Sequence, residues 1–74
     1  MTAIDTIAKL MDDSRVTLAE MAEYGDFGTK QNVFLKLNSK DLKVGAFVKM
    51  LEVLGYQLVV QNGETDDEIL IEYD

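Results

Sequence analysis

A short run of hydroxyl, lysine and amide side chains, Thr29-Lys30-Gln31-Asn32, is the part of this 74-residue chain best suited to binding a ligand. Amide and lysine side chains hydrogen-bond the edges of DNA bases, whereas lysines and hydroxyls near helix ends bind phosphates. More groups of these kinds follow, namely Lys36, Asn38, Ser39, Lys40 and Lys43. Taken residue by residue, the segment is either a DNA-contacting surface or the solvated polar face of a helical domain.

The charge of the chain is segregated around this run. Five of the seven basic residues lie between Lys30 and Lys49, although the formal net charge is -7. Residues 28–49 carry five lysines against Asp41, a balance of +4, so the two flanks together carry -11. An anion can therefore approach one face of the domain, while the other faces repel it.

Catalysis has little support in the sequence. The chain has no cysteine and no histidine, which removes the usual nucleophile–base pairs and zinc ligand sets. The densest carboxylate cluster, Asp66-Asp67-Glu68, is interpreted as a solvated acidic loop, because a run of charges does not by itself supply converging ligands. We expect no enzyme activity and no cofactor, and an enzyme with a carboxylate-bound metal is a distant third alternative.

The length predicts one small domain with a single core. No apolar run approaches the ~20 residues that span a bilayer, and residues 1–10 lack the basic stretch of a secretory signal. We therefore expect a soluble cytoplasmic protein with no membrane partner.

Apolar periodicity predicts two helices before the polar run. The first spans Thr2 to Asp12, and the second runs from Leu18 to about Tyr24. Thr17 and Glu20 have the spacing of a capping box, which satisfies free backbone N–H groups at a helix start. The inward side chains are expected to be Ile4, Ile7, Ala8 and Met11 in the first helix and Leu18, Met21 and Ala22 in the second.

Two further helices are predicted after a turn at residues 25–28. Thr29 is expected to cap a third helix that continues through Lys36, and Ser39 to cap a fourth helix from Lys40 to Leu54. The turn is too short for a phosphate-binding loop and joins two helices. The inward side chains are expected to be Val33, Phe34 and Leu37 in the third helix and Val44, Phe47, Met50, Leu51 and Leu54 in the fourth.

After Gly55 the apolar period changes to two, which predicts a strand from Tyr56 to Gln61. A second strand is expected from Glu68 to Tyr73, joined by a loop that continues through Asp67. A two-stranded ribbon is marginal alone, so it must pack on a second copy or on the first helix of its own subunit. The residues expected to mediate dimerisation are Tyr56, Leu58, Val60, Ile69 and Ile71, with Tyr73 on the same face.

The segment from about Ile4 to Val60 resembles the lambda-repressor-like helix-turn-helix family, the xenobiotic-response-element type of bacterial and phage regulators. The resemblance lies in Thr17-x-x-Glu20-Met21-Ala22, in Gln31-Asn32-Val33, and in Lys43-Val44 followed by Met50 to Val60 with its Leu54-Gly55-Tyr56. It implies a mainly α fold, a four-helix helix-turn-helix domain followed by a C-terminal β-strand or β-hairpin. It also implies that Thr29, Lys30, Gln31 and Asn32 face bases, with Lys36, Ser39, Lys40 and Lys43 near phosphates.

The leading hypothesis is a non-catalytic regulator, of phage or bacterial type, that binds a near-palindromic site on double-stranded DNA as a homodimer. The alternative is a protein-interaction module on the same scaffold, an antirepressor or antitoxin-like protein whose acidic flanks bind a basic partner.

Overall fold

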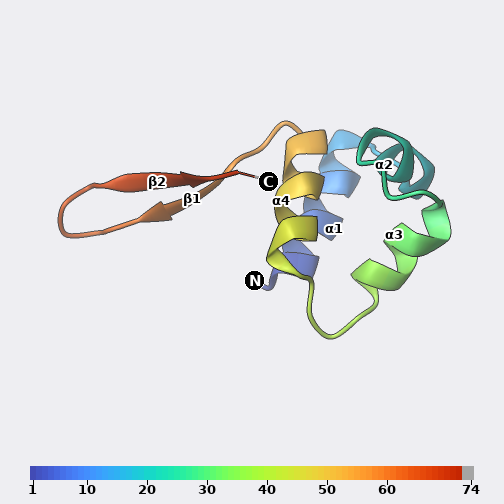
Figure 1. The fold of residues 1–74 in the computed structure, drawn as a ribbon, viewed down its shortest axis with the longest axis horizontal. Helices are drawn as coiled ribbons and strands as arrows, with labels where there is room; N and C mark the ends of the chain where they lie inside the picture. Colours follow the sequence, from blue (N-terminus) through green and yellow to red (C-terminus); the bar gives the residue numbers. More distant parts are fainter. Residues whose placement is uncertain (73–74) are drawn as a thin grey trace.

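The computed structural model describes residues 1–72 and contains, within them, four α-helices followed by an antiparallel β-hairpin (Figure 1). The elements are α1 (Ala3–Ser14), α2 (Leu18–Tyr24), α3 (Lys30–Leu37), α4 (Val44–Val53), β1 (Leu58–Gln61) and β2 (Glu68–Ile71). The helices form one body, and the hairpin projects away from it. The predicted mainly α domain with a C-terminal β-hairpin is confirmed. Within residues 1–72, no helix has the length and apolar character needed to cross a membrane.

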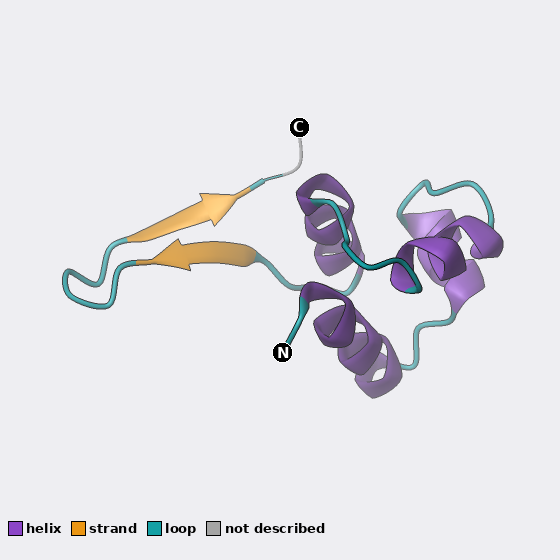
Figure 2. Ribbon diagram, turned by 90° about the horizontal axis from the view of Figure 1, so that it is seen from below, coloured by secondary structure: helices purple, strands orange, loops and turns teal. Residues whose placement is uncertain are grey.

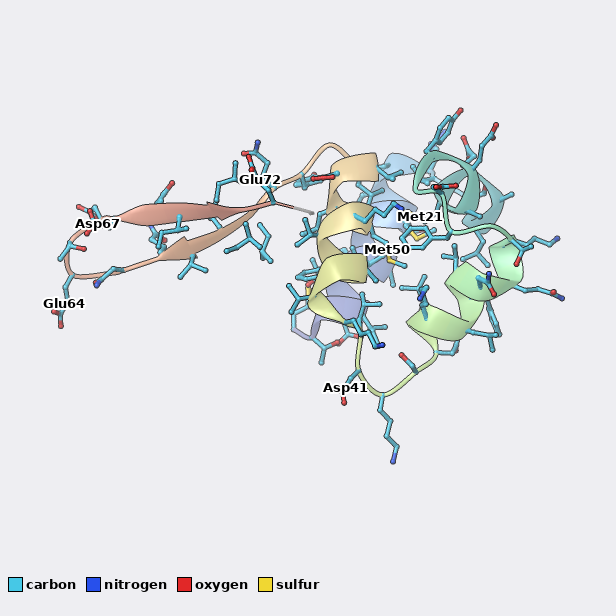
Figure 3. The ribbon with its side chains drawn as sticks, viewed as in Figure 1. Met21, Asp41, Met50, Glu64, Asp67 and Glu72 are labelled. Carbon is cyan, nitrogen blue, oxygen red and sulfur yellow. The ribbon has the colours of Figure 1, made fainter. Side chains whose placement is uncertain are left out.

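The core draws on every helix of the body. Ile7, Met21, Val33 and Met50, one from each helix, are fully buried. α4 packs against α1 and α2, and α2 packs against α3, so α2 links the two ends of the body. Met21 and Met50 lie between α2 and α4 in Figure 3. The buried side chains of the described part are all apolar, so the core is held by packing rather than by a polar network.

Capping boxes mark the starts of the first two helices, α1 and α2. The predicted box before α2 is confirmed: the Glu20 backbone N–H donates to the Thr17 hydroxyl over 3.1 Å, and the Thr17 N–H donates to the Glu20 carboxylate over 3.0 Å. Thr2 and Asp5 form a second box before α1. α1 then runs to Ser14, past the predicted end at Asp12, and stops where Arg15 adopts a left-handed conformation with φ 57°.

The predicted start of the fourth helix is wrong, because Ser39 does not cap α4 and its side chain bonds back to the last turn of α3. Its hydroxyl lies 2.7 Å from the carbonyl oxygen of Lys36 and 2.9 Å from that of Asp41, and it donates to one of them at a time. α4 begins at Val44, and its N-cap residue, Lys43, makes no side-chain capping bond. A connection outside helical structure therefore separates α3 from α4.

Three of the side chains expected to point inward are exposed. Phe34 is 52% exposed because α3 packs mainly on α2, and Val33 alone on this helix is fully covered. Val44 is 64% exposed because it is the first residue of the shortened α4. Ala8 is also exposed. The inward faces of α1, α3 and α4 are therefore each missing one predicted side chain, whereas all three predicted for α2 are covered.

The end of α4 agrees with the predicted glycine stop. Gly55 has φ +84°, and the Tyr56 N–H donates to the carbonyl oxygen of Leu51 over 2.8 Å, which is the pattern of a Schellman motif. The chain then leaves the body and enters β1 at Leu58, two residues after the predicted strand start at Tyr56.

The hairpin has the long loop that the sequence predicts. Leu58 pairs with Ile71 and Gln61 pairs with Glu68, so residues 62–67 form the loop. The Asn62 N–H closes it by donating to the carbonyl oxygen of Asp67 over 2.9 Å. β2 ends at Ile71, whereas the predicted strand continues to Tyr73, which lies outside the described residues.

Candidate nucleic-acid interface

The turn between α2 and α3 is fixed by the partly buried Phe27. Its N–H donates to the carbonyl oxygen of Ala22 over 2.9 Å, and its ring lies against Gly25. A Cβ on Gly25 would stand 2.3 Å from that ring, so only glycine fits there. Gly28 has φ +90°, a conformation that side chains disfavour. Gly25 thus leaves room for the Phe27 ring, and Gly28 supplies a positive φ just before α3.

The first residues of α3 divide into two pairs. The Thr29 hydroxyl accepts the Asn32 N–H over 3.2 Å, and the Asn32 side-chain amide donates to the carbonyl oxygen of Phe27 over 3.0 Å. Both side chains therefore tie α3 to the turn. Lys30 and Gln31 are exposed and form no side-chain hydrogen bond with residues 1–72. Of the four residues predicted to face bases, these two have their polar groups available.

The residues predicted to lie near phosphates fall into two places. Lys36, in the last turn of α3, and Lys43, before α4, line one groove of about 750 Å³ between these helices. Lys40 lies outside this groove, on the exposed connection. Ser39 lines a smaller adjoining groove of about 280 Å³, which shares Lys36 and Lys43. The structure thus brings two of the three predicted lysines together.

Lys49 also lines this groove, although it is not among the residues predicted to contact DNA. It lies on α4, is partly buried, and places its ammonium 5.3 Å from the centre of the Phe27 ring, within cation–π range. The available signal was its place at the end of the lysine-rich stretch. Its helical position and the fold of the turn were needed to place it beside Phe27.

The groove is not purely polar. Leu35, which is 65% exposed, lines it together with Phe27 and Ala46. Gly45 adds no side chain to its wall. A carboxylate, Asp26, also lines it, so the balance of formal charge along the groove is three lysines against one acid.

The hairpin carries a second, purely acidic set of charges, away from this groove. Glu64, Asp66, Asp67, Glu68 and Glu72 carry five negative charges, and residues 56–72 contain no basic residue. Figure 3 shows Glu64 and Asp67 near the tip and Glu72 near the base. Asp67 accepts a hydrogen bond from the Thr65 hydroxyl over 3.0 Å. In the described part of the chain, no three potential ligands converge as a metal site would require.

The residues predicted for dimerisation share one face of the hairpin, except for Tyr56. The register pairs Leu58 with Ile71 and Val60 with Ile69, and directly opposed residues point to the same side. Leu58 and Ile71 are partly buried, whereas Val60 is 54% and Ile69 63% exposed. Tyr56 precedes the strand and is also exposed. The outer half of this apolar face is therefore open.

Comparison of the chain with protein-family models, with curated proteins and with solved structures found no match.

Proposed function

We propose that the protein is a non-catalytic, DNA-binding transcriptional regulator of phage or bacterial type that acts in the cytoplasm as a homodimer. The supporting observation is the start of α3: a helix held on α2 by a rigid turn presents Lys30 and Gln31 to solvent, with Lys36, Lys40 and Lys43 following on the exposed surface. In helix-turn-helix readers the second helix of the motif enters the major groove with its N-terminal residues against base edges.

The side chains of this surface have different tasks in the proposal. Lys30 and Gln31 contact base edges, because both are long and carry hydrogen-bonding ends that the fold does not use. Thr29 and Asn32 hold α3 in place, and the Thr29 hydroxyl keeps its hydrogen for a phosphate. The lysines that follow α3 neutralise phosphates, which supplies affinity without sequence information.

Homodimerisation through the hairpin completes the proposal. A two-fold axis through the apolar face of Val60 and Ile69 would cover both exposed side chains with those of the second copy. Two copies would also present two reading helices, which a near-palindromic DNA site requires.

The experiment that tests the proposal is selection from a random-sequence duplex pool at ~50 and ~200 mM salt, followed by titration of the enriched site. The wild type should enrich a near-palindromic site, and each phosphate contact should steepen the salt slope by about 0.9. The K30A/Q31A variant should lose the preference for that site. Lys9→Ala, a single-lysine loss on α1, is the control and should keep the preference.

A protein-interaction module on the same scaffold, antirepressor or antitoxin-like, is the second candidate. The observation in its favour is the hairpin, with its five described acids and no base, which offers a surface for a basic partner. No retention of DNA at ~50 mM salt, with K30A/Q31A indistinguishable from wild type, would reject the DNA-binding proposal in favour of this candidate.

A further inference from the structure

The groove between α3 and α4 has a mixed character that phosphate binding alone does not require. Lys36, Lys43 and Lys49 line it, and Phe27 and Leu35 supply apolar surface between them. Lys36 and Lys43 form no ion pair with any residue from 1 to 72. A DNA phosphate would use the charges and leave the apolar surface wet, whereas a peptide with neighbouring acidic and apolar side chains would use both.

The hairpin of this chain has that composition. Glu64 lies in the tip loop, Glu68 is the first residue of β2, and Ile69 and Leu70 follow directly. Ile69 is 63% exposed and Leu70 43% exposed, although both are large and apolar. The cross-strand register places Ile69 and Leu70 on opposite faces of the ribbon. One apolar face can therefore be covered in a hairpin–hairpin dimer while the other remains open.

We infer that the lysine groove binds the acidic hairpin of a second copy of this chain. Glu64 and Glu68 lie against Lys36 and Lys43, and an apolar side chain of β2 lies on the surface formed by Phe27 and Leu35. The hairpin leaves the body beyond the C-terminal end of α4 and points away from α3 (Figure 1), so it does not reach its own groove. Figure 2 shows the same separation from a second direction.

Reciprocal docking closes the assembly. If each copy places its hairpin in the groove of the other, the two contacts are related by a two-fold axis and no free hairpin or groove remains. The acidic hairpin then occupies the lysines that the proposed function assigns to phosphates. In this one respect the inference rests on the proposed function: the docked form and the DNA-bound form exclude each other.

The test is a charge-swap experiment without DNA. One variant, K36E/K43E, reverses the groove, and the other, E64K/E68K, reverses the hairpin. Lys36 and Lys43 are free of side-chain hydrogen bonds to residues 1–72, and Glu68 has only a 3.4 Å contact with the Gln61 amide. Circular dichroism melting verifies that each variant folds. The dissociation constant is measured by fluorescence anisotropy of a labelled variant titrated with an unlabelled one.

Each variant alone should associate about tenfold more weakly than wild type at ~50 mM salt, and the mixture of the two should recover wild-type affinity. The control partner is D12K/E23K, which carries the same charge change on exposed acids of α1 and α2. It leaves one of the two reciprocal contacts repulsive, so its mixture with K36E/K43E should stay weaker than wild type. Equal rescue by both partners, or no rescue by E64K/E68K, would overturn the docking. Neither result depends on whether the protein binds DNA.

Discussion

The helical body buries a set of apolar side chains, whereas the two strands of the hairpin bury none. In the body, one residue from each helix is fully buried, and the core draws on all four helices. In the hairpin, Val59, Val60, Ile69 and Leu70 are between 43% and 63% exposed. The described chain is correspondingly elongated, with extents of 41 × 22 × 22 Å. The body has its own buried core, whereas no residue of β1 or β2 is buried and the hairpin keeps apolar surface that a second molecule can cover.

The two regions differ in charge as well. The lysines cluster where the body is grooved, and the hairpin has five acids in its described part. Apolar surface and unbalanced charge therefore coincide in the hairpin. This combination suits a surface that changes partners, since burial gives affinity and charge makes the affinity respond to salt. Substitutions in the body should consequently change the unfolding free energy of the monomer, whereas substitutions in the hairpin should change association.

The largest expected effect is in the core of the body. Met50→Ala removes a fully buried side chain that lies beside Met21, and we expect the free energy of unfolding to fall by about 2–5 kcal/mol. Val60→Ala in the hairpin is the comparison, and it should change the unfolding of the monomer by less than about 0.5 kcal/mol. Urea denaturation at low protein concentration measures both. Similar losses for the two variants would mean that the hairpin contributes to the monomer core.

The two glycine turns give the next contrast. Gly25→Ala places a Cβ against the Phe27 ring and 2.8 Å from the carbonyl oxygen of Met21, so the ring must move. We expect a loss of about 1–3 kcal/mol in unfolding free energy. Gly63→Ala in the hairpin loop meets no atom within 4 Å and should be neutral or stabilise by about 0.4–1 kcal/mol.

The same pair of variants also tests the candidate interface, because Phe27 lines the lysine groove as well as fixing the turn. Gly25→Ala should shift the NMR amide signals of Lys36 and Lys49, whereas Gly63→Ala should leave them unchanged. Unshifted signals in Gly25→Ala would show that the ring adapts without disturbing the groove.

Local sequence signals were sufficient for much of this fold. The capping box at Thr17 and Glu20, the glycine stop at Gly55 and the loop through Asp67 all depend on residues close in sequence, and all three are confirmed. The start of α4 was not predictable in the same way. A serine before a helix and a serine after a helix look alike in sequence, and Ser39 bonds backward to Lys36.

The candidate site was harder to predict from the sequence, because it depends more on tertiary contacts. The exposure of Lys30 and Gln31 follows from the helix period, but the tie from Asn32 to Phe27 requires the geometry of the turn. Lys49 joins the groove because Phe27 folds beneath it, a contact between residues 22 positions apart that no local pattern records. The apolar part of the groove was not predicted for the same reason, since Leu35 becomes part of a groove only through the packing of α3 beside α4.

A smaller effect is expected on the exposed apolar face of the hairpin. V60S/I69S should leave the unfolding of the monomer within about 0.5 kcal/mol of wild type, because both side chains are more than half exposed. The dissociation constant of the proposed homodimer should rise about tenfold, which corresponds to about 1.4 kcal/mol. Sedimentation equilibrium measures it, with T65A in the loop as the control. An unchanged constant would exclude this face from the dimer and leave the reciprocal docking in place.

The smallest expected effect concerns the Lys9–Asp13 ion pair of the body. The described residues of the hairpin include no base and therefore no such pair. The Lys9 ammonium lies 2.7 Å from the Asp13 carboxylate, and this hydrogen bond, followed by the charge of Asp13, raises the pKa of Lys9 above its ordinary value of 10.5. A folded pKa above the unfolded one means that the contribution is fully present below the unfolded pKa and is lost as the pH rises through the folded pKa. Both side chains are exposed, so solvent screens the pair. Lys9→Gln should therefore lower Tm slightly at neutral pH and should match wild type once the pH exceeds the folded pKa. A difference in Tm that persisted there would assign the effect of Lys9 to the packing of its methylene groups on α1 instead of to its charge.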